Sequence, residues 1–566
     1  MKNKILFPFV LVLLIASCKS KKSTVAVENV PVAAIVLSIP DTVISAEIQE
    51  SIQHISEDDY KMEGHYLFSS TILPKAYDSN HYMPLWSADT NRRVAIQYLT
   101  NSWQHGLLPE DYAIDEIIQY ENNYDTLNAV QRADYDILLT DGVLLYAYHV
   151  LRGKLDPETL SPTWNFSKKA IPKDALELLM GSLTDYSLAK NLNLLEPTHD
   201  AYGRMKTELI YYRESVIEDN WEQVNFPKTL HPGEIDVSIP KLRTRLQAEG
   251  YLIVTDSNTS TLYDNYTVHA VEDYQTKHGL TPDGILGTAT VKMINLTAED
   301  KLKMLITNLE RIKWVDFDES NPYIKVNIAS FRMQYFDNGM ETYASNVVVG
   351  KVTKKTPVFQ DEMVLVVLNP TWTLPFSITS TETLSKLKRD SLYLRKHNMV
   401  LMTHKGEIVS DEGIDWSKYE KGHFPYMVRQ QPGPNNALGQ VKFLFPNKYA
   451  IYLHDTPSKY LFSREERAFS HGCIRLQNPL SFAAFLLEKQ DTTWSMDSIK
   501  AVIETRQTMN IRLKHKIPIY LLYQTAGVDD QNQLYFYHDI YGRDEEVYNK
   551  LMNKETNEEK VKSRLN

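Results

Sequence analysis

The chain reads Ser470-His471-Gly472-Cys473-Ile474-Arg475-Leu476 in its C-terminal third, and this heptapeptide carries its clearest chemical signal. Cys473 is one of only two cysteines in 566 residues. A neighbouring imidazole favours formation of a thiolate, and a glycine lets the backbone turn tightly beside an approaching substrate. The heptapeptide therefore predicts a nucleophilic cysteine that performs acyl transfer, with an inert buried thiol as the alternative.

The other cysteine, Cys18, follows a stretch typical of an export signal. Residues 1–17 contain Lys2 and Lys4 and then a short apolar run that is too short to span a bilayer comfortably. Residues 15–18, Ile-Ala-Ser-Cys, resemble a bacterial lipobox, in which cleavage before the cysteine leaves it lipidated. We expect lipidation at Cys18 and a place in the bacterial cell envelope, lipid-anchored and facing the periplasm. An ordinary secretory signal with an incidental cysteine is the alternative, and the choice between inner and outer membrane stays open.

Composition narrows the classes of partner. The formal net charge is −11, which argues against nucleic acid as a partner. The sequence has no clustered pattern of metal ligands and no glycine-rich phosphate loop, so we expect no metal and no organic cofactor. The length predicts several domains.

The N-terminal half is expected to be mostly helical. Residues 18–58 lack durable periodicity and are interpreted as a membrane tether. Residues 59–227 are predicted to form a helical scaffold domain, because Leu138, Leu145 and Leu151 recur at helical spacings before Gly153 ends the run.

Residues 228–298 form a compact unit with three short predicted helices. Gly250-Tyr251, Ala270-Val271, Tyr274-Gln275 and Asp283-Gly284-Ile285 resemble the three-helix peptidoglycan-binding module. This resemblance implies binding to glycan strands. A helical spacer that no longer binds glycan is the alternative.

The C-terminal part changes to strand-like patterns. Residues 299–545 are predicted to be a β-rich domain, in which the polar and irregular residues 377–440 form an inserted lid. Residues 517–524 and 534–539 are expected to pair as a closing hairpin, and residues 546–566 are expected to be a polar tail.

His454 completes the catalytic pattern, because fifteen residues separate it from Ser470. The pattern His-x₁₅-Ser-His-Gly-Cys-x-Arg resembles the signature of L,D-transpeptidases of the YkuD fold. Further motifs resemble the large YcbB-like subgroup: Asn369-Pro370-Thr371-Trp372, Asn436-Ala437-Leu438-Gly439, Lys442-Phe443 and His454-Asp455-Thr456-Pro457. The resemblance implies a multidomain α+β protein with a helical scaffold, a three-helix peptidoglycan-binding module and a YkuD-like catalytic domain with a capping lid.

The resemblance also implies roles for individual residues. Cys473 is the expected nucleophile and His454 the expected general base and later acid. Asp455 is expected to orient His454 through its backbone carbonyl, with the Asp455 carboxylate as the alternative. Backbone amides at His471, Gly472 and Cys473 are candidates for an oxyanion hole.

Four further side chains are candidates for the substrate cleft. His471 is expected to position the oxyanion or the substrate, and Arg475 to offer a bidentate fork to a carboxylate. Tyr452 and Trp372 are expected to line the cleft. Each of the four also has a purely structural alternative.

The implied reaction joins stem peptides of peptidoglycan. Cys473 attacks the third residue of a tetrapeptide stem, D-Ala leaves, and an amine of a second stem resolves the thioester to give a 3→3 crosslink. The family also implies carbapenem sensitivity at this cysteine. One alternative on the same fold is an L,D-carboxypeptidase or a transferase that fixes another protein or amino acid to the stem. An alternative of another class is a non-catalytic lipoprotein that holds the wall.

Overall fold

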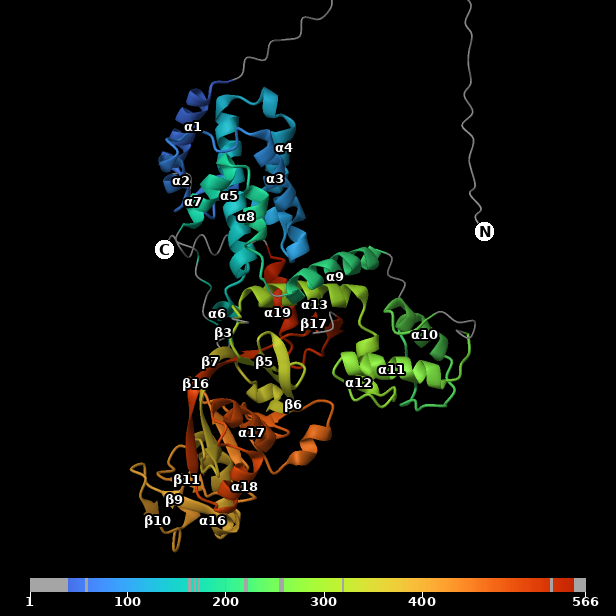
Figure 1. Ribbon diagram of the computed structural model, residues 1–566, viewed down its shortest axis with the longest axis vertical. Helices are drawn as coiled ribbons and strands as arrows, with labels where there is room; N and C mark the ends of the chain where they lie inside the picture. The colour runs from blue at the N-terminus through green and yellow to red at the C-terminus, as the bar shows by residue number, and fades with distance from the viewer. Residues whose placement is uncertain are drawn as a thin grey trace, which may run out of the picture.

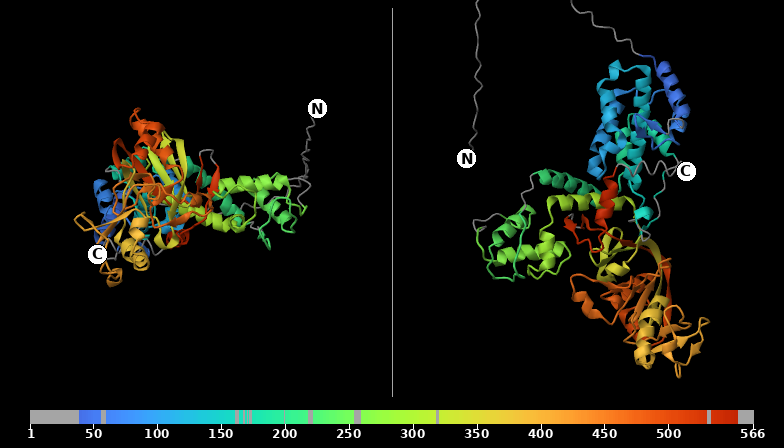
Figure 2. Two further views of the ribbon diagram at one scale, coloured as in Figure 1. Left: turned by 90° about the horizontal axis from the view of Figure 1, so that it is seen from below. Right: turned by 180° about the vertical axis from the view of Figure 1, so that it is seen from behind.

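The structure is a computed structural model, which describes residues 39–55, 60–160, 164–166, 169, 171, 174–198, 200–217, 222–253, 259–317, 320–529 and 533–553. The predicted signal peptide, Cys18 and residues 18–38 of the predicted tether lie outside these residues. Figure 1 shows a helical part at one end and a β-rich part at the other. A small helical module projects to the side, as both views in Figure 2 also show.

The scaffold is built around one long helix, α5, whose side chains are buried along most of its length. A capping box between Asn128 and Gln131 starts α5, and Gly153 with φ +86° follows its end. No helix in the described ranges combines the length and the apolar character needed to cross a membrane. The hydrophobic core of the scaffold is formed by the helices α1 (Asp41–His54), α2 (Leu73–Ser79), α3 (Asp89–Thr100), α4 (Ile114–Asn122), α5 (Ala129–Arg152), α7 (Ala175–Thr184) and α8 (Leu188–Asn193).

Helix α1 corrects the prediction of a tether over residues 18–58. Residues 41–54 form a helix whose Ile44, Ile48 and Ile52 are buried in the scaffold core. These three positions recur every four residues and so share one face of a helix. The tether interpretation is therefore wrong for this part of the chain.

The side module contains α10 (Ile239–Ala248), α11 (Asn265–Lys277) and α12 (Thr288–Ile294). Asp264 caps α11 by accepting a hydrogen bond from the Thr267 amide, 2.9 Å away. The Arg243 guanidinium is buried and donates to the Thr267 hydroxyl and to backbone carbonyls of the loop before α11. These contacts join the first and second helices of the module.

Two long helices connect the module to the rest of the molecule. Helices α9 (Asp200–Ile217) and α13 (Ala298–Lys313) share one hydrophobic core with the module. The predicted domain boundary between residues 298 and 299 therefore falls at the start of α13, a helix that packs against α9.

The C-terminal helix α19 (Asp544–Leu551) corrects the predicted polar tail over residues 546–566. Val547 and Leu551 are buried, and Asp544 forms an ion pair with Arg311 on α13 at 2.6 Å. The Leu551 carbonyl also accepts a hydrogen bond from the buried Lys154 ammonium at 2.6 Å. The first turns beyond residue 545 are thus part of the core.

The catalytic part is a sheet in the order β12-β13-β15-β6-β5-β4-β16-β7-β3, and an additional pairing of β12 with β7 closes most of this path into a ring. Two helices, α17 (Pro479–Gln490) and α18 (Met496–Glu504), pack beside it. The strands are β3 (Trp164–Asn165), β4 (Tyr323–Asn327), β5 (Arg332–Asp337), β6 (Met340–Gly350), β7 (Val358–Leu368), β12 (Val441–Leu444), β13 (Leu453–His454), β14 (Ala468–Ser470), which pairs with β6, β15 (Ile474–Leu476) and β16 (Met509–Leu522).

The expected closing hairpin is wrong. Residues 517–522 belong to β16, which pairs with β4 in parallel and with β7 antiparallel. The hairpin partner of β18 (Leu534–Phe536) is instead β17 (Ala526–Val528). The continuous apolar run of β16 reflects a strand buried within the sheet, which local patterning cannot distinguish from one arm of a hairpin.

The inserted segment has a small core of its own. A four-stranded sheet in the order β10-β9-β11-β8 is covered by short helices. Its elements are β8 (Trp372–Thr373), α14 (Phe376–Ile378), α15 (Leu384–Arg389), α16 (Tyr393–Lys396), β9 (Met399–Met402), β10 (Ile408–Val409) and β11 (Met427–Gln430). The core side chains are Leu374, Leu384, Leu387, Leu394, Leu401, Trp416, Phe424 and Val428.

Candidate active site

Three neighbouring strands place five polar side chains on one face of the catalytic sheet. His454 on β13 lies opposite both Arg475 on β15 and Lys442 on β12. Cys473 and Tyr452 precede Arg475 and His454 by two positions, and side chains alternate across a strand with a period of two. All five therefore face the same side. The intervening side chains are fully buried in the core: Phe443, Leu453 and Ile474.

His454 is oriented by a backbone carbonyl. Its Nδ1 lies against the Asp455 carbonyl oxygen, so Nδ1 carries the proton and Nε2 is left to accept one. The Asp455 carboxylate is engaged elsewhere, because it accepts hydrogen bonds from the Gln440 amide at 2.8 Å and from the Lys459 ammonium at 2.5 Å. The geometry therefore favours the carbonyl over the carboxylate as the orienting group.

The resting pair of Cys473 and His454 is neutral. Burial raises the pKa of the partly buried Cys473 thiol, although Tyr452, Lys442 and Arg475 act in the opposite direction. Burial, Arg475 and Lys442 lower the pKa of His454 to about 3. At neutral pH the imidazole is therefore an unprotonated base that can take the thiol proton during attack.

Lys442 is a member of the site that sequence reasoning missed. Burial lowers the pKa of its ammonium, and the Cys473 thiolate would raise it. Its Nζ lies 4.9 Å from the centre of the Tyr452 ring. The Lys442-Phe443 motif could have predicted this position. Side chains alternate along a strand, and Lys442 pairs with His454, so the two side chains lie on the same face of the sheet.

The Gly472 amide corrects one predicted role. It donates to the Ser470 hydroxyl at 3.0 Å, and that hydroxyl donates to the Cys473 carbonyl at 2.6 Å. The Gly472 amide is therefore occupied within the loop, so the amides of His471 and Cys473 remain as candidates for the oxyanion hole. Gly472 itself has φ +123°, a conformation that favours glycine.

Thr356, which sequence reasoning also missed, holds the loop that contains Gly472 in place. Its hydroxyl donates to the Gly472 carbonyl and accepts from the Gly350 amide, each at 2.8 Å. The Tyr541 hydroxyl donates to the Gly350 carbonyl at 2.5 Å. The C-terminal segment thereby supports the loop that carries Cys473.

Tyr452 and Trp372 come together at the site, and Arg475 lies beside them. The Tyr452 hydroxyl interacts with Cys473, and Trp372 on β8, which pairs with β11 of the inserted segment, hydrogen-bonds to Tyr452. Burial raises the pKa of Tyr452, so its hydroxyl stays protonated. The Arg475 Nε is buried and makes no hydrogen bond within the described part of the chain, which is consistent with a group that receives a ligand.

The His471 side chain contacts the inserted segment. Its Nε2 is 3.0 Å from the Glu382 carboxylate, and both side chains are more than two-fifths exposed. Glu382 belongs to the turn before α15, so this pair links the catalytic loop to the lid.

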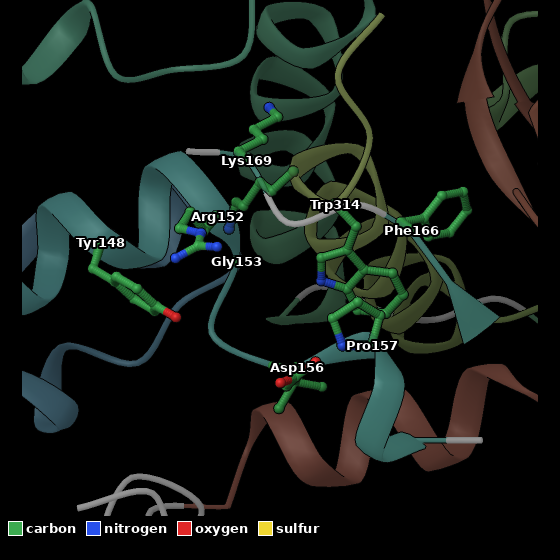
Figure 3. Close-up of a pocket in the computed structure, with 10 residues that line it drawn as sticks. Tyr148, Arg152, Gly153, Asp156, Pro157, Phe166, Lys169 and Trp314 are labelled. Carbon is green, nitrogen blue, oxygen red and sulfur yellow. The ribbon is translucent and has the colours of Figure 1, made fainter. Parts of the chain in front are cut away.

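A separate small cavity of about 30 Å³ lies at the joint between α5 and the β-rich part (Figure 3). Its walls include Arg152, Gly153, Asp156 and Trp314, none of which comes from the strands that carry the site. Its size suits about one water molecule, so we assign it a structural role.

Three family models match the chain in order. A scaffold domain model matches residues 71–209, a model described as "Putative peptidoglycan binding domain" matches residues 237–294, and an L,D-transpeptidase catalytic domain model, YkuD, matches residues 321–503. These matches and the observed architecture confirm the predicted fold class of helical scaffold, helical peptidoglycan-binding module and β-rich YkuD-like domain.

A curated relative from Haemophilus influenzae, "Putative L,D-transpeptidase", is 35% identical over 259 residues. The match covers 46% of this chain and only 50% of the relative. Solved L,D-transpeptidases from Xylanimonas cellulosilytica and Stackebrandtia nassauensis are 12% and 14% identical, with TM-scores of 0.17 and 0.20. Each aligns with 53% of this chain and with 99% and 97% of its own length.

The order of the matched domains and the residues that surround Cys473 point to the same family. The chain matches, in this order, the models of a scaffold domain, a peptidoglycan-binding domain and, in its C-terminal part, the YkuD catalytic domain of L,D-transpeptidases.

Proposed function

We propose that this chain is an L,D-transpeptidase that forms 3→3 crosslinks between peptidoglycan stem peptides. The observation that carries the proposal is the shared face of Cys473, His454 and Arg475, with the His454 ring held by the Asp455 carbonyl. A neutral imidazole beside a neutral thiol is the starting state for base-assisted nucleophilic attack.

The reaction proceeds in two half-reactions. His454 takes the Cys473 proton as the sulfur attacks the carbonyl of the third stem residue, and the same proton passes to the amine of the departing D-Ala. A side-chain amine of a second stem then attacks the thioester. His454 takes a proton from that amine and returns it to the sulfur as the new amide forms.

The two cations on the face have complementary tasks. Arg475 and Lys442 stabilise negative charge near Cys473 and attract the carboxylates of the stem peptide. Trp372 and Tyr452 form the wall that joins the lid to the catalytic sheet. We also propose that lipid on Cys18 holds the protein in the cell envelope with this site facing the periplasm.

The test follows the products of the purified protein, residues 39–566, with a disaccharide-tetrapeptide by mass spectrometry. We expect a dimer that lacks one D-Ala, no product with Cys473→Ala, and a loss of at least a thousandfold with His454→Gln. A carbapenem should add its mass to the parent protein but not to Cys473→Ala. Loss of D-Ala without dimer would replace the proposal with a carboxypeptidase. Absence of both turnover and a carbapenem adduct would contradict the enzyme assignment.

A further inference from the structure

A short segment near the C-terminus joins the helical module to the residues that support the catalytic loop. Residues 536–541 start at the last residue of β18 and contact the module at one end and the catalytic domain at the other. Figure 1 shows β17, the partner strand of β18, beside α13, the helix that leads from the module to the catalytic sheet. Residues 536–541 are called the strap below.

The first two residues of the strap pack on the end of α11. The Phe536 carbonyl oxygen and amide nitrogen lie 2.8 Å and 3.1 Å from Nδ1 of His278, and the Phe536 and His278 rings are stacked. The Tyr537 ring packs on Gly279, where an added Cβ would come within 2.9 Å of it. Both contacts are close enough that the strap follows any movement of this end of the module.

The third residue of the strap contacts the module and lies near the segment that leads into the catalytic loop. His538 Nε2 is 2.6 Å from the Lys292 ammonium on α12. Burial and this ammonium lower the pKa of His538, while the Glu466 carboxylate acts in the opposite direction. The His538 imidazole is therefore neutral and accepts the Lys292 proton donor. Glu466 lies only four residues before Ser470 in the chain.

The second half of the strap is fixed from within the catalytic domain. The Tyr523 hydroxyl donates to the Asp539 carboxylate and accepts from the Tyr541 amide at 2.8 Å. The Tyr523 and Tyr541 rings are stacked with centroids 5.5 Å apart, and both side chains are buried. The Asp539 carboxylate also accepts from the amides of Arg543 and Asp544. Because packed interiors transmit strain, a displacement at one end of the strap moves the other end.

Tyr541 passes this position to the catalytic loop. Its hydroxyl donates to the Gly350 carbonyl at 2.5 Å and accepts from the Thr356 amide at 3.1 Å. Gly350 pairs with Ser470, and the Thr356 hydroxyl donates to the Gly472 carbonyl at 2.8 Å. An unbroken series of contacts therefore runs from the helical module to the residues on both sides of the nucleophile.

We propose that the strap makes the position of the nucleophile depend on the docked helical module, with Tyr541 as the positioning residue at the catalytic end. The strap lies outside the peptidoglycan-binding match and the catalytic-domain match, so neither matched region contains the connection by itself. The inference rests on the proposed function only in taking Cys473 as the nucleophile. When the module is released from the strap, the Cys473 thiolate should lose part of its stabilisation by Lys442 and Arg475.

The test changes the two ends of the strap separately. Tyr541→Phe removes the hydroxyl at the catalytic end, and its control, Tyr343→Phe, removes a hydroxyl that donates to a backbone carbonyl elsewhere in the domain at 3.1 Å. Gly279→Ala displaces the ring that packs on it at the module end. Its control is Gly233→Ala, since Gly233 has φ +83° against +70° for Gly279 and nothing within 4 Å of its added Cβ among the described residues. Lys292→Met is a second module-end variant, and the melting temperature shows which variants are folded.

The first measurement is the rate at which iodoacetamide alkylates Cys473 at pH 7. The full chain carries Cys18→Ser, which leaves Cys473 as the only thiol. We expect Tyr541→Phe to slow alkylation about threefold, the effect of a rise of about half a unit in the thiol pKa. Gly279→Ala and Lys292→Met should each slow it about twofold, and both controls should react as the parent does. Equal rates for the parent and the folded strap variants would overturn the proposal.

A double variant tests whether the two ends act through one connection. Gly279→Ala combined with Tyr541→Phe should be alkylated no more slowly than Tyr541→Phe alone, because the connection is already broken at Tyr541. Effects that multiply in the double variant would show that the two ends act independently, and would contradict the strap.

Turnover of a disaccharide-tetrapeptide separates this proposal from the proposed function. In the strap variants kcat should fall with the alkylation rate while KM changes less than about twofold, because the strap positions the nucleophile and not the substrate. A raised KM with an unchanged alkylation rate would contradict the proposal. A parent without turnover, whose variants still show the expected pattern of alkylation, would contradict the proposed function alone.

Discussion

Single residues at the active site act through the charge they carry and the space they leave. Lys442 and Arg475 bring two cations to the face that holds Cys473 and His454. They oppose the effect of burial on the Cys473 pKa and reinforce its effect on the His454 pKa. The effect on Cys473 helps the transfer of a proton from sulfur to imidazole, whereas the effect on His454 keeps the imidazole unprotonated at neutral pH but makes it a weaker base.

Lys442→Met tests this electrostatic role. Without the cation the pKa of His454 rises from about 3, so the imidazole is protonated at higher pH and the acid limb of kcat/KM moves upward. We expect the acid limb of kcat/KM to move upward by about one pH unit, with little change in kcat/KM at neutral pH. The pH profile is the measurement, and the exposed Lys448→Met is the control. Superimposable profiles for Lys442→Met and the parent would remove Lys442 from the mechanism.

Gly439 leaves the space that Asp455 needs. It has φ +60°, and an added Cβ would collide with the Asp455 carboxylate. We expect Gly439→Ala to lose about 1–2 kcal/mol of unfolding free energy from the left-handed backbone alone, and to lower kcat because the displaced Asp455 no longer orients His454.

The control for this prediction is Gly413→Ala in the lid. Gly413 has φ +76° and nothing within 4 Å of the added Cβ, so it carries the backbone cost without the collision. Denaturant unfolding and steady-state kinetics measure both variants. Equal kcat values for the two would show that Asp455 tolerates displacement.

At the scale of elements, short segments that are unremarkable in sequence are held by contacts with distant parts of the chain. Helix α1 packs through three isoleucines into the scaffold, and α19 anchors to α13 through Asp544. The lid has its own apolar core and touches the catalytic loop through Glu382 and His471. Each element is therefore a structural part of the domain that it joins.

Ile48→Ala tests whether α1 belongs to the folded scaffold. Ile48 is fully buried, so removing its side chain should cost about 2–5 kcal/mol of unfolding free energy. Val43 on the same helix is 45% exposed, and Val43→Ala should cost much less. Urea unfolding of residues 39–566 provides both values. Equal losses of unfolding free energy in the two variants would contradict the packing of α1 into the scaffold core.

At the scale of the whole molecule, one histidine ties the helical module to the C-terminal hairpin. His278 follows α11, is buried, and its Nδ1 lies 2.8 Å from the carbonyl oxygen and 3.1 Å from the amide nitrogen of Phe536. Burial and the nearby Lys301 lower its pKa to about 4. Because the unfolded chain binds a proton more tightly, this contribution to stability is complete above pH 6.5 and declines as the pH falls towards 4.

His278→Gln should therefore change the pH dependence of stability. Between pH 7 and pH 5 the parent should lose about 2 kcal/mol more unfolding free energy than the variant does. Denaturant titrations at the two pH values measure the difference, and the exposed His404→Gln is the control. A parent and a His278→Gln variant that lose stability equally would contradict a buried, neutral His278.

The sequence by itself determined the domain order and the helical and strand-rich halves, and it predicts Cys473 with His454 as the reacting pair, because these depend on local periodicity and on a long motif. Only the tertiary structure decided which groups face Cys473, that Lys442 is among them, that the Gly472 amide is occupied, and that β16 lies within the sheet. It also decided that residues 41–54 and 544–551 join the core. These outcomes depend on contacts between residues far apart in the chain and on burial, and neither burial nor the pKa shifts that burial causes can be derived from local sequence.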